Sequence, residues 1–328
     1  MEISPLGYTN IDQRKLPSEI MYVEYQHKCK DDNPDNPDNP DIKTILIFEL
    51  NNKILQYIID NNYVSLIIDY NLYKDTLLIN NIPSTIKYLE FDYESEFTEP
   101  LNNLPSSLIY LKLSDVYNHP LNNLPLLLEY LICGAQFNQV LDFLPPCLKY
   151  ISLSDNFNYP LDVLPDNLLY LYIHSCVFNQ PIIYKLPISL IVLNIRIYYP
   201  CILTIECVEN LTNLREIYLC DTVYFDINNV IWPDTITLLH LDCCDNYNIP
   251  LINLPKNLEK LEVSYPFDIY TNIIKVDNKV DNKVDNKVIL PLSLQTFTYF
   301  DMYPKTDENI KQLNELSQLY PAITVKHK

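Results

Sequence analysis

The chain has 328 residues, of which 48% are hydrophobic, and it carries a formal net charge of −19 at pH 7. The apolar share is large enough for a continuous core and excludes a globally disordered chain. The acidic balance disfavours nucleic acid and anionic membrane surfaces as partners, because both attract clustered Lys and Arg. The excess of acidic residues has two possible explanations. The simpler one is that the charge keeps the protein soluble, and the other is that it attracts a basic partner.

The N-terminal segment, residues 1–30, is weakly patterned and has no apolar run typical of a secretory signal. No stretch of the chain approaches the ~20 apolar residues that span a bilayer. Nine cysteines without a signal peptide indicate reduced thiols. We therefore expect an intracellular protein without a transmembrane segment.

The next two segments lead into a repeat array. Residues 31–41 contain tandem Asp-Asn-Pro triplets, and their prolines forbid helix and internal sheet, so they form a linker. Residues 42–78 are interpreted as an N-terminal cap with a degenerate repeat. Glu49–Asn62 has helical spacing of apolar residues, which suits a cap over the first coil of an array.

A proline recurs in steps of 20 to 22 residues through the middle of the chain. A fixed period near 20 residues is typical of a solenoid. We expect a leucine-rich-repeat-like β-solenoid with short parallel strands and about 10 coils of roughly 20–24 residues, over residues 79–303. The most regular part is 97–181. The recurring prolines are Pro83, Pro105, Pro125, Pro145, Pro165 and Pro187.

Positions within a coil are counted here from its proline. Leu or another apolar residue recurs at +3, +6 and +8, Phe or Tyr at about +12, and Asn at about +13. Positions +6 and +8 alternate with variable residues at +5, +7 and +9, which is the period of a strand. The recurring asparagines are expected to hydrogen-bond backbone groups in the turn. They are Asn118, Asn138, Asn158, Asn179 and Asn248.

Past the regular coils, the array continues in degenerate form. Residues 275–288, a reiterated Val-Asp-Asn-Lys tract, lengthen one coil and are interpreted as a loop insertion. Residues 304–328 are expected to form a C-terminal helical cap. Thr306–Leu319 has an N-cap threonine, a single apolar face and a proline at 321 that stops the helix.

The phrases Phe157-Asn-Tyr-Pro160-Leu-Asp-Val-Leu-Pro165 and Phe178-Asn-Gln-Pro181 resemble the FNIP repeats. This leucine-rich-repeat-like family is abundant in social amoebae and in giant viruses of amoebae, so the resemblance implies host cytoplasm as the compartment. Many viral relatives join the repeats to an F-box that recruits a ubiquitin ligase. Leu16-Pro-Ser-Glu-Ile20 resembles an F-box opening, and residues 1–30 are therefore interpreted as an F-box remnant.

Groups capable of chemistry are few. Cys243-Cys244 is an adjacent pair and lacks the spacing of zinc sites. His174 and Cys176 stand two residues apart, but the other strand histidine, His240, is too far along the array to orient them. We expect no enzyme, no metal site, no cofactor and no small-molecule substrate.

The concave face of the solenoid is the predicted binding surface. Tyr recurs at +5 and would form a file that either only stacks or also recognises a partner. We expect a non-catalytic protein–protein interaction solenoid, and the resemblance implies a substrate-recognition adaptor in ubiquitin ligation. The alternative is a structural or self-associating repeat protein. The predicted partner-binding residues are Tyr110, Lys112, Tyr130, Ile132, Tyr150, Ser152, Tyr170, Tyr172, His174 and Arg196.

Overall fold

The structure is a computed structural model with two compact units, Met1–Tyr159 and Pro160–Lys328. It describes residues 9–10, 22–26, 44–47, 50, 52–68, 79–92, 95–180, 186–197, 208–220, 230–242, 251–264, 273, 290–300 and 307–328.

Several sequence predictions lie outside the described residues. They concern the F-box-like residues 16–20, the Asp-Asn-Pro linker of residues 31–41, the loop insertion 275–288, the Cys243-Cys244 pair and Asn248. These expectations stay predictions.

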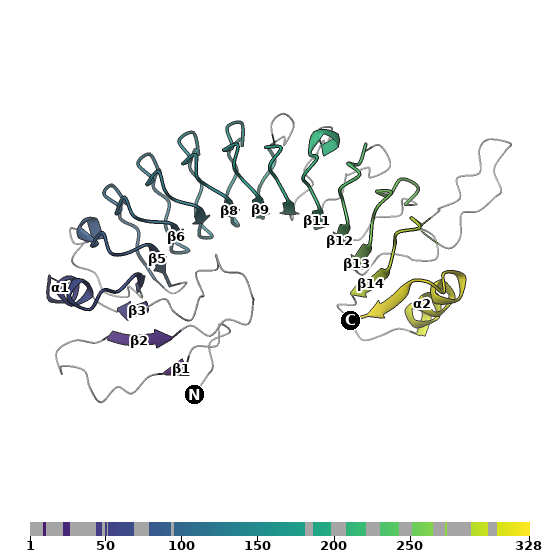
Figure 1. Cartoon of the computed structure of the whole chain (residues 1–328), viewed down its shortest axis with the longest axis horizontal. Coiled ribbons are helices and arrows are strands. Elements are labelled where there is room, and N and C mark those ends of the chain that lie inside the picture. Colours follow the sequence, from purple (N-terminus) through teal and green to yellow (C-terminus); the bar gives the residue numbers. More distant parts are fainter. Residues whose placement is uncertain are drawn as a thin grey trace. The chain divides into compact units, whose positions relative to one another are not determined.

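The first unit is a row of short strands that follow one another in chain order (Figure 1). From β3 onward each strand pairs in parallel with the next. After each strand of the repeats the chain leaves the row in a turn and returns to form the next strand, which is the geometry of a solenoid coil. The elements are β1 (Thr9–Asn10), β2 (Tyr22–Gln26), β3 (Thr44–Ile47), α1 (Asn52–Asp60), β4 (Ser65–Ile68), the 3-10 helix η2 (Ile79–Asn81), β5 (Tyr88–Phe91), β6 (Tyr110–Lys112), β7 (Tyr130–Ile132) and β8 (Tyr150–Leu153).

The N-terminal strands differ from the repeats in direction. Strand β2 pairs antiparallel with β3, and β1 pairs antiparallel with β2. An F-box would need helices here, whereas the described residues 9–10 and 22–26 are strands. The F-box-like residues 16–20 themselves lie outside the described part of the chain.

The second unit continues the same construction. All neighbouring strands from β9 to β15 pair in parallel, and Figure 1 shows these strands in chain order. The elements are β9 (Tyr170–Ser175), β10 (Val192–Ile197), the 3-10 helix η3 (Val208–Asn210), β11 (Glu216–Cys220), β12 (Leu238–Asp242), β13 (Lys260–Ser264), β14 (Thr296–Phe300), α2 (Asp307–Leu319) and β15 (Thr324–His327).

The expected fold class, a parallel β-solenoid with a C-terminal helix, is confirmed. The helix expected from residue 306 begins at Asp307 and ends at Leu319. The chain does not finish with it, because β15 follows α2 and pairs with β14. The coil count differs slightly from the expected ten, with about eight turns in the part of the chain that the structure describes. Strands β3, β4 and β15 also pair in parallel outside residues 79–303.

The core is a column of apolar side chains at the repeat positions. At +6, residues such as Leu111, Ile151 and Leu193 are 0% exposed. Position +8 is also buried, even where Cys133 replaces the usual Leu. Burial of each such side chain contributes about 1.5–3 kcal/mol relative to an exposed one. The alternation of buried and half-buried residues along β6 to β9 confirms the predicted strand phase.

The repeating proline starts a tight turn. Its carbonyl oxygen accepts a hydrogen bond from the +3 backbone N–H, at 3.0 Å for Leu108 and Pro105 and at 3.0 Å for Leu190 and Pro187. Proline has no N–H and a fixed φ, so it suits the start of the turn rather than the ladder. Leu211, where the proline is missing, makes the same bond with Leu214 at 3.0 Å.

The aromatic and Asn positions link neighbouring coils. The rings of Phe137 and Phe157 stack with centroids 6.4 Å apart. The amide oxygen of Asn118 accepts the backbone N–H of Asn138 at 2.9 Å, and that of Asn138 accepts the backbone N–H of Asn158 at 3.0 Å. The expected hydrogen bonding to backbone is confirmed for Asn118 and Asn138, and the partner is the next coil. Asn248 lies outside the described residues.

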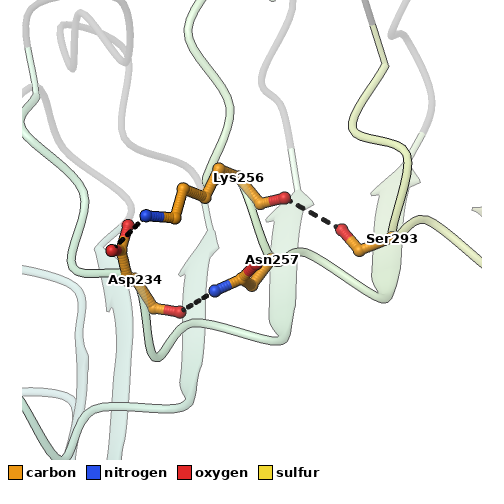
Figure 2. Close-up of polar contacts among 4 residues, drawn as sticks. All are labelled: Asp234, Lys256, Asn257 and Ser293. Atoms are coloured by element: carbon orange, nitrogen blue, oxygen red, sulfur yellow. Dashed lines mark hydrogen bonds and ion pairs between the residues drawn. The ribbon is translucent and has the colours of Figure 1, made fainter.

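Polar side chains at +1 and +2 form a second ladder on the turn side. Figure 2 shows one stretch: Asn257 donates to the carbonyl oxygen of Asp234 at 2.8 Å, and Ser293 donates to that of Lys256 at 3.0 Å. Lys256 also pairs with the Asp234 carboxylate. The ion pair is exposed and contributes little, whereas the +2 side chains satisfy backbone carbonyls of the preceding coil.

Candidate functional site

The candidate site is the surface formed by the outward side chains of the strands, called the strand face below. It consists of positions +5 and +7 of the repeat strands, which are half-buried on either side of a fully buried +6 residue along β6 to β8. Position +9 was expected to belong to it, and the first unit is mixed at this position. Ser114 is buried and its hydroxyl donates to the carbonyl oxygen of Phe97 at 2.7 Å, whereas Asp92 and Ser154 are half-buried.

In the first unit, tyrosines at +5 lie in register on adjacent strands. Tyr110 faces Tyr88 on one side and Tyr130 on the other, and Tyr130 faces Tyr150. Their ring centroids are 6.4, 6.3 and 6.0 Å apart in that order, with the planes tilted by 33° to 42°. Pairs of this geometry contribute about 0.5–1.5 kcal/mol beyond their buried area. The predicted tyrosine file is therefore present from β5 to β8.

Two ion pairs lie on or beside the strand face in this unit. The Lys112 ammonium lies 2.6 Å from the Glu90 carboxylate, and both side chains are half-buried on the face. At +4, Lys149 lies 2.9 Å from Glu129. Ile132 and Ser152 continue the +7 row without charge. The strand face of the first unit thus carries tyrosine rings, and the carboxylates of Glu90 and Glu129 beside them are each paired with a lysine.

In the second unit, strands β9 and β10 are longer and carry outward side chains at three positions. Tyr170, Tyr172 and His174 alternate with buried residues on β9. The imidazole of His174 lies 3.1 Å from the amide oxygen of Asn194 on β10, and its ring meets Tyr172 edge-on at 6.0 Å. Arg196 is half-buried and in register with His174. Position +9 belongs to the face here because these strands extend two residues further.

Further along the second unit, a set of rings and carboxylates gathers on β11 to β14. The Tyr218 hydroxyl donates to the Glu216 carboxylate at 3.0 Å, and His240 Nδ1–H donates to the Glu262 carboxylate at 3.1 Å. The His240 ring lies 5.6 Å from the Tyr218 ring and 5.7 Å from the Phe300 ring. We call these five residues the ring–carboxylate cluster.

Burial and nearby carboxylates raise the pKa values of two tyrosines on this face, Tyr218 and Tyr172. Burial, the hydrogen bond to Glu216 and the negative charges of Glu216 and Glu262 raise the pKa of Tyr218 far above its ordinary value. Burial and then the charge of Glu216 also raise the pKa of Tyr172. Both phenols therefore stay protonated and able to donate at neutral pH.

The described residues offer little for catalysis or metal binding. Among them, no group of three or more His, Cys, Asp or Glu side chains could hold a metal ion. The His174 imidazole lies 3.1 Å from the amide oxygen of Asn194. In the part of the chain that the structure describes, no helix is long and apolar enough to cross a membrane.

The predicted partner-binding residues are divided between the units. Six are on β6 to β8 of the first unit and four on β9 and β10 of the second. Their role in binding stays a prediction. Sequence reasoning missed Glu216 and Tyr218, because the coil starting at Leu211 lacks both the proline and the Phe-Asn pair. Counting from Leu211 would have placed Glu216 and Tyr218 on the face.

Comparison with known proteins supports the repeat assignment. The family model described as FNIP Repeat matches residues 137–176. The expected resemblance is therefore confirmed over these two coils. No curated protein sequence matches the chain.

Solved structures with the same architecture include CroV588, described as a circular leucine-rich-repeat protein, from a giant virus. It is 23% identical, with a TM-score of 0.55 over 86% of this chain and 49% of that chain. This chain thus spans about half the length of CroV588, and the likeness shows the fold alone.

Two bacterial proteins were also found. An internalin of Listeria monocytogenes is 18% identical, with a TM-score of 0.47 over 80% of this chain and 72% of that chain. YopM of Yersinia enterocolitica is 20% identical, with a TM-score of 0.30 over 73% of this chain and 62% of that chain. A leucine-rich-repeat-like solenoid of this kind is typical of protein-interaction scaffolds.

Proposed function

We propose that this FNIP-repeat solenoid is a non-catalytic protein-binding scaffold whose strand face contacts a protein partner. The face is built on a ladder of hydrogen-bonded strands above a fully buried core. Side chains held in this way lose little further freedom when a partner binds, which favours affinity.

One observation carries the proposal: the inward positions are monotonous and the outward positions are diverse. Every +6 residue from Leu89 to Phe297 is apolar and 0% exposed. At +7 the strands instead carry acids, bases, amides, hydroxyls and rings. Packing dictates the first set, and nothing in the packing dictates the second. The half-buried +7 residues are Glu90, Lys112, Ile132, Ser152, Tyr172, Asn194, Tyr218, His240 and Glu262, whereas Thr298 at +7 on β14 is buried.

The tyrosine file supplies suitable anchors in the first unit. Each ring is held by its neighbours at 6.0 to 6.4 Å and is half-buried. Tyrosine offers a large apolar area and a hydroxyl, and it is enriched among residues that dominate binding energy. Stacking alone would also account for the file, and the experiment below separates the two roles.

The proposed partner is a protein rather than nucleic acid or membrane, because the net charge of −19 opposes both anionic surfaces. The proposed compartment is the host cytoplasm, by analogy with FNIP proteins of amoebal giant viruses. The narrower role of substrate-recognition adaptor in ubiquitin ligation is supported only by the resemblance of residues 16–20 to an F-box opening.

Affinity capture from amoeba cells tests the proposal. The chain is compared with a Tyr130→Ala/Tyr150→Ala variant and with Tyr159→Ala, which removes an exposed tyrosine on the turn side. We expect the paired variant to keep its circular-dichroism spectrum and to lose the captured proteins, and Tyr159→Ala to keep them.

Two outcomes oppose the proposal. Capture that survives the paired change but is lost on Tyr159→Ala would place recognition away from the strand face. Concentration-dependent oligomers in light scattering, with no captured host protein, would favour a self-associating structural role.

A further inference from the structure

The ring–carboxylate cluster of the second unit differs from the first-unit face in how its charge is balanced. Glu90 and Glu129 pair with lysines. Glu216 instead accepts a phenol hydroxyl, and Glu262 accepts an imidazole N–H. Among the described residues, no ion pair joins Glu216 or Glu262 to a lysine or arginine. Two carboxylates therefore stand on this face without a permanent positive partner.

Cationic side chains do occur on the same strands. Lys260 is exposed and lies two residues before Glu262 on β13, and Arg196 lies on β10 at the far side of β11. Among the described residues, no ion pair joins Lys260 to a carboxylate of the cluster. The cluster therefore keeps a net negative charge on a half-buried surface, where opposite charges attract more strongly than in bulk water.

Three aromatic rings lie beside these carboxylates. Tyr218, His240 and Phe300 follow one another at centroid distances of 5.6 and 5.7 Å. At the end of the row, the Lys328 ammonium lies 5.6 Å from the centroid of Phe300. A cation is attracted to the face of an aromatic ring at such a distance. The row thus already holds one positive group of the chain at its edge.

We propose that the ring–carboxylate cluster binds an arginine side chain from a basic segment of the partner protein; this rests on the proposed role of the strand face. A guanidinium is planar, so it stacks on ring faces while its N–H groups donate to carboxylates. Ring faces and carboxylates are both present within the ring–carboxylate cluster. The net charge of −19 would also draw a basic segment toward the chain.

Fluorescence anisotropy with defined peptides tests the inference on the full chain. The probes are labelled Gly-Arg-Gly-Arg-Gly-Arg-Gly and the same peptide with lysine or with glutamate in place of arginine. The test variant is Glu216→Gln/Glu262→Gln. The matched control is Glu209→Gln/Glu259→Gln, which removes two exposed charges from the same unit.

We expect the unchanged chain to bind the arginine peptide, and the test variant to bind it at least about tenfold more weakly. The control should bind within about twofold of the unchanged chain. Three results would each overturn the inference: equal binding by the test variant, no binding by the unchanged chain, or equal affinity for the glutamate peptide. Equal affinity for the lysine peptide would overturn the assignment to arginine.

The capture experiment separates this inference from the proposed function. If Tyr130→Ala/Tyr150→Ala loses the captured proteins and Glu216→Gln/Glu262→Gln keeps them, only the arginine site fails. If both variants keep every captured protein, the strand face itself is not the recognition surface.

Discussion

Gly134 lies against the backbone of Ser114 in the preceding coil. A Cβ atom built on Gly134 would stand 2.0 Å from the Ser114 carbonyl oxygen and 2.6 Å from the Cα atom of Asp115. Carbon atoms do not approach backbone atoms this closely, so the stacking of these two coils requires a residue without a side chain. The chain has only two glycines, and one of them occupies this contact.

Gly134→Ala should therefore destabilise the first unit, because either coil must shift to make room. We expect a cost of about 1–3 kcal/mol, as for other overpacked sites. Ser154, which occupies the same repeat position one coil later and already has a Cβ, is the control. Ser154→Ala should remain within about 0.5 kcal/mol of the unchanged chain. Urea unfolding followed by circular dichroism measures both, and an unchanged midpoint for Gly134→Ala would disprove the contact.

A second comparison checks the strand phase at β6. Leu111 is 0% exposed, so Leu111→Ala should cost about 2–5 kcal/mol through lost burial and a residual cavity. Its neighbour Lys112 points to the opposite face and pairs with Glu90. Lys112→Ala should cost at most about 1 kcal/mol, the usual value of a partly exposed pair. Equal destabilisation in urea unfolding would show that the phase is wrong.

The sequence was sufficient for the coil, because the coil is specified by short-range spacing. Leu111 and Leu113 lie two residues apart and both are buried, as period 2 requires. Pro105 and Leu108 close a turn within four residues. Each of these relations is repeated in many coils, so local pattern and global fold agree.

The side-chain contacts between coils could not be obtained in this way. Tyr218, His240 and Phe300 come from coils whose spacing in sequence is irregular, and their rings meet only because the strands are in register. The close approach of Gly134 to Ser114 likewise depends on how two coils stack. Contacts of this kind depend on how the strands of neighbouring coils are aligned in space. The repeat period in the sequence does not specify that alignment.

The ladder at +2 gives a stabilising prediction. Ser107 and Ser189 each donate to the carbonyl oxygen of the +3 residue in the preceding coil, at 2.9 and 2.6 Å. Leu127 occupies this position in its own coil and is 56% exposed. Leu127→Ser should allow the same bond to Leu108 and should stabilise the chain by about 0.5–1.5 kcal/mol.

Its control is the neighbouring Leu126, which is 71% exposed and occupies +1 rather than +2. Leu126→Ser also replaces an exposed leucine but has no equivalent carbonyl to reach, so its effect should lie within about 0.5 kcal/mol. Differential scanning calorimetry compares the two variants. If the melting temperature rises for both variants, the gain comes from removing a surface leucine. If it rises for neither variant, Leu127→Ser does not form the expected stabilising hydrogen bond.

Tyr117 replaces the usual Phe at +12 and is fully buried. Its hydroxyl oxygen accepts the backbone N–H of Leu101 at 3.3 Å, which explains the exception to the repeat pattern. Tyr117→Phe leaves this buried N–H without its acceptor. The expected loss of stability at neutral pH is about 1 kcal/mol, measured by urea unfolding.

The same residue predicts a loss of stability in alkali. Burial is the main cause that raises the pKa of Tyr117 from 10.0 to about 12. An unfolded chain would release this proton near pH 10 and the folded chain would not, so the stabilisation is complete below pH 10 and is lost as the pH rises toward 12. At roughly pH 11.5 the unchanged chain should have lost about 2 kcal/mol relative to Tyr117→Phe, compared with the difference at pH 9. Tyr159→Phe, at an exposed tyrosine, should show no such change, and parallel pH profiles for Tyr117→Phe and the unchanged chain would contradict the burial of the phenol.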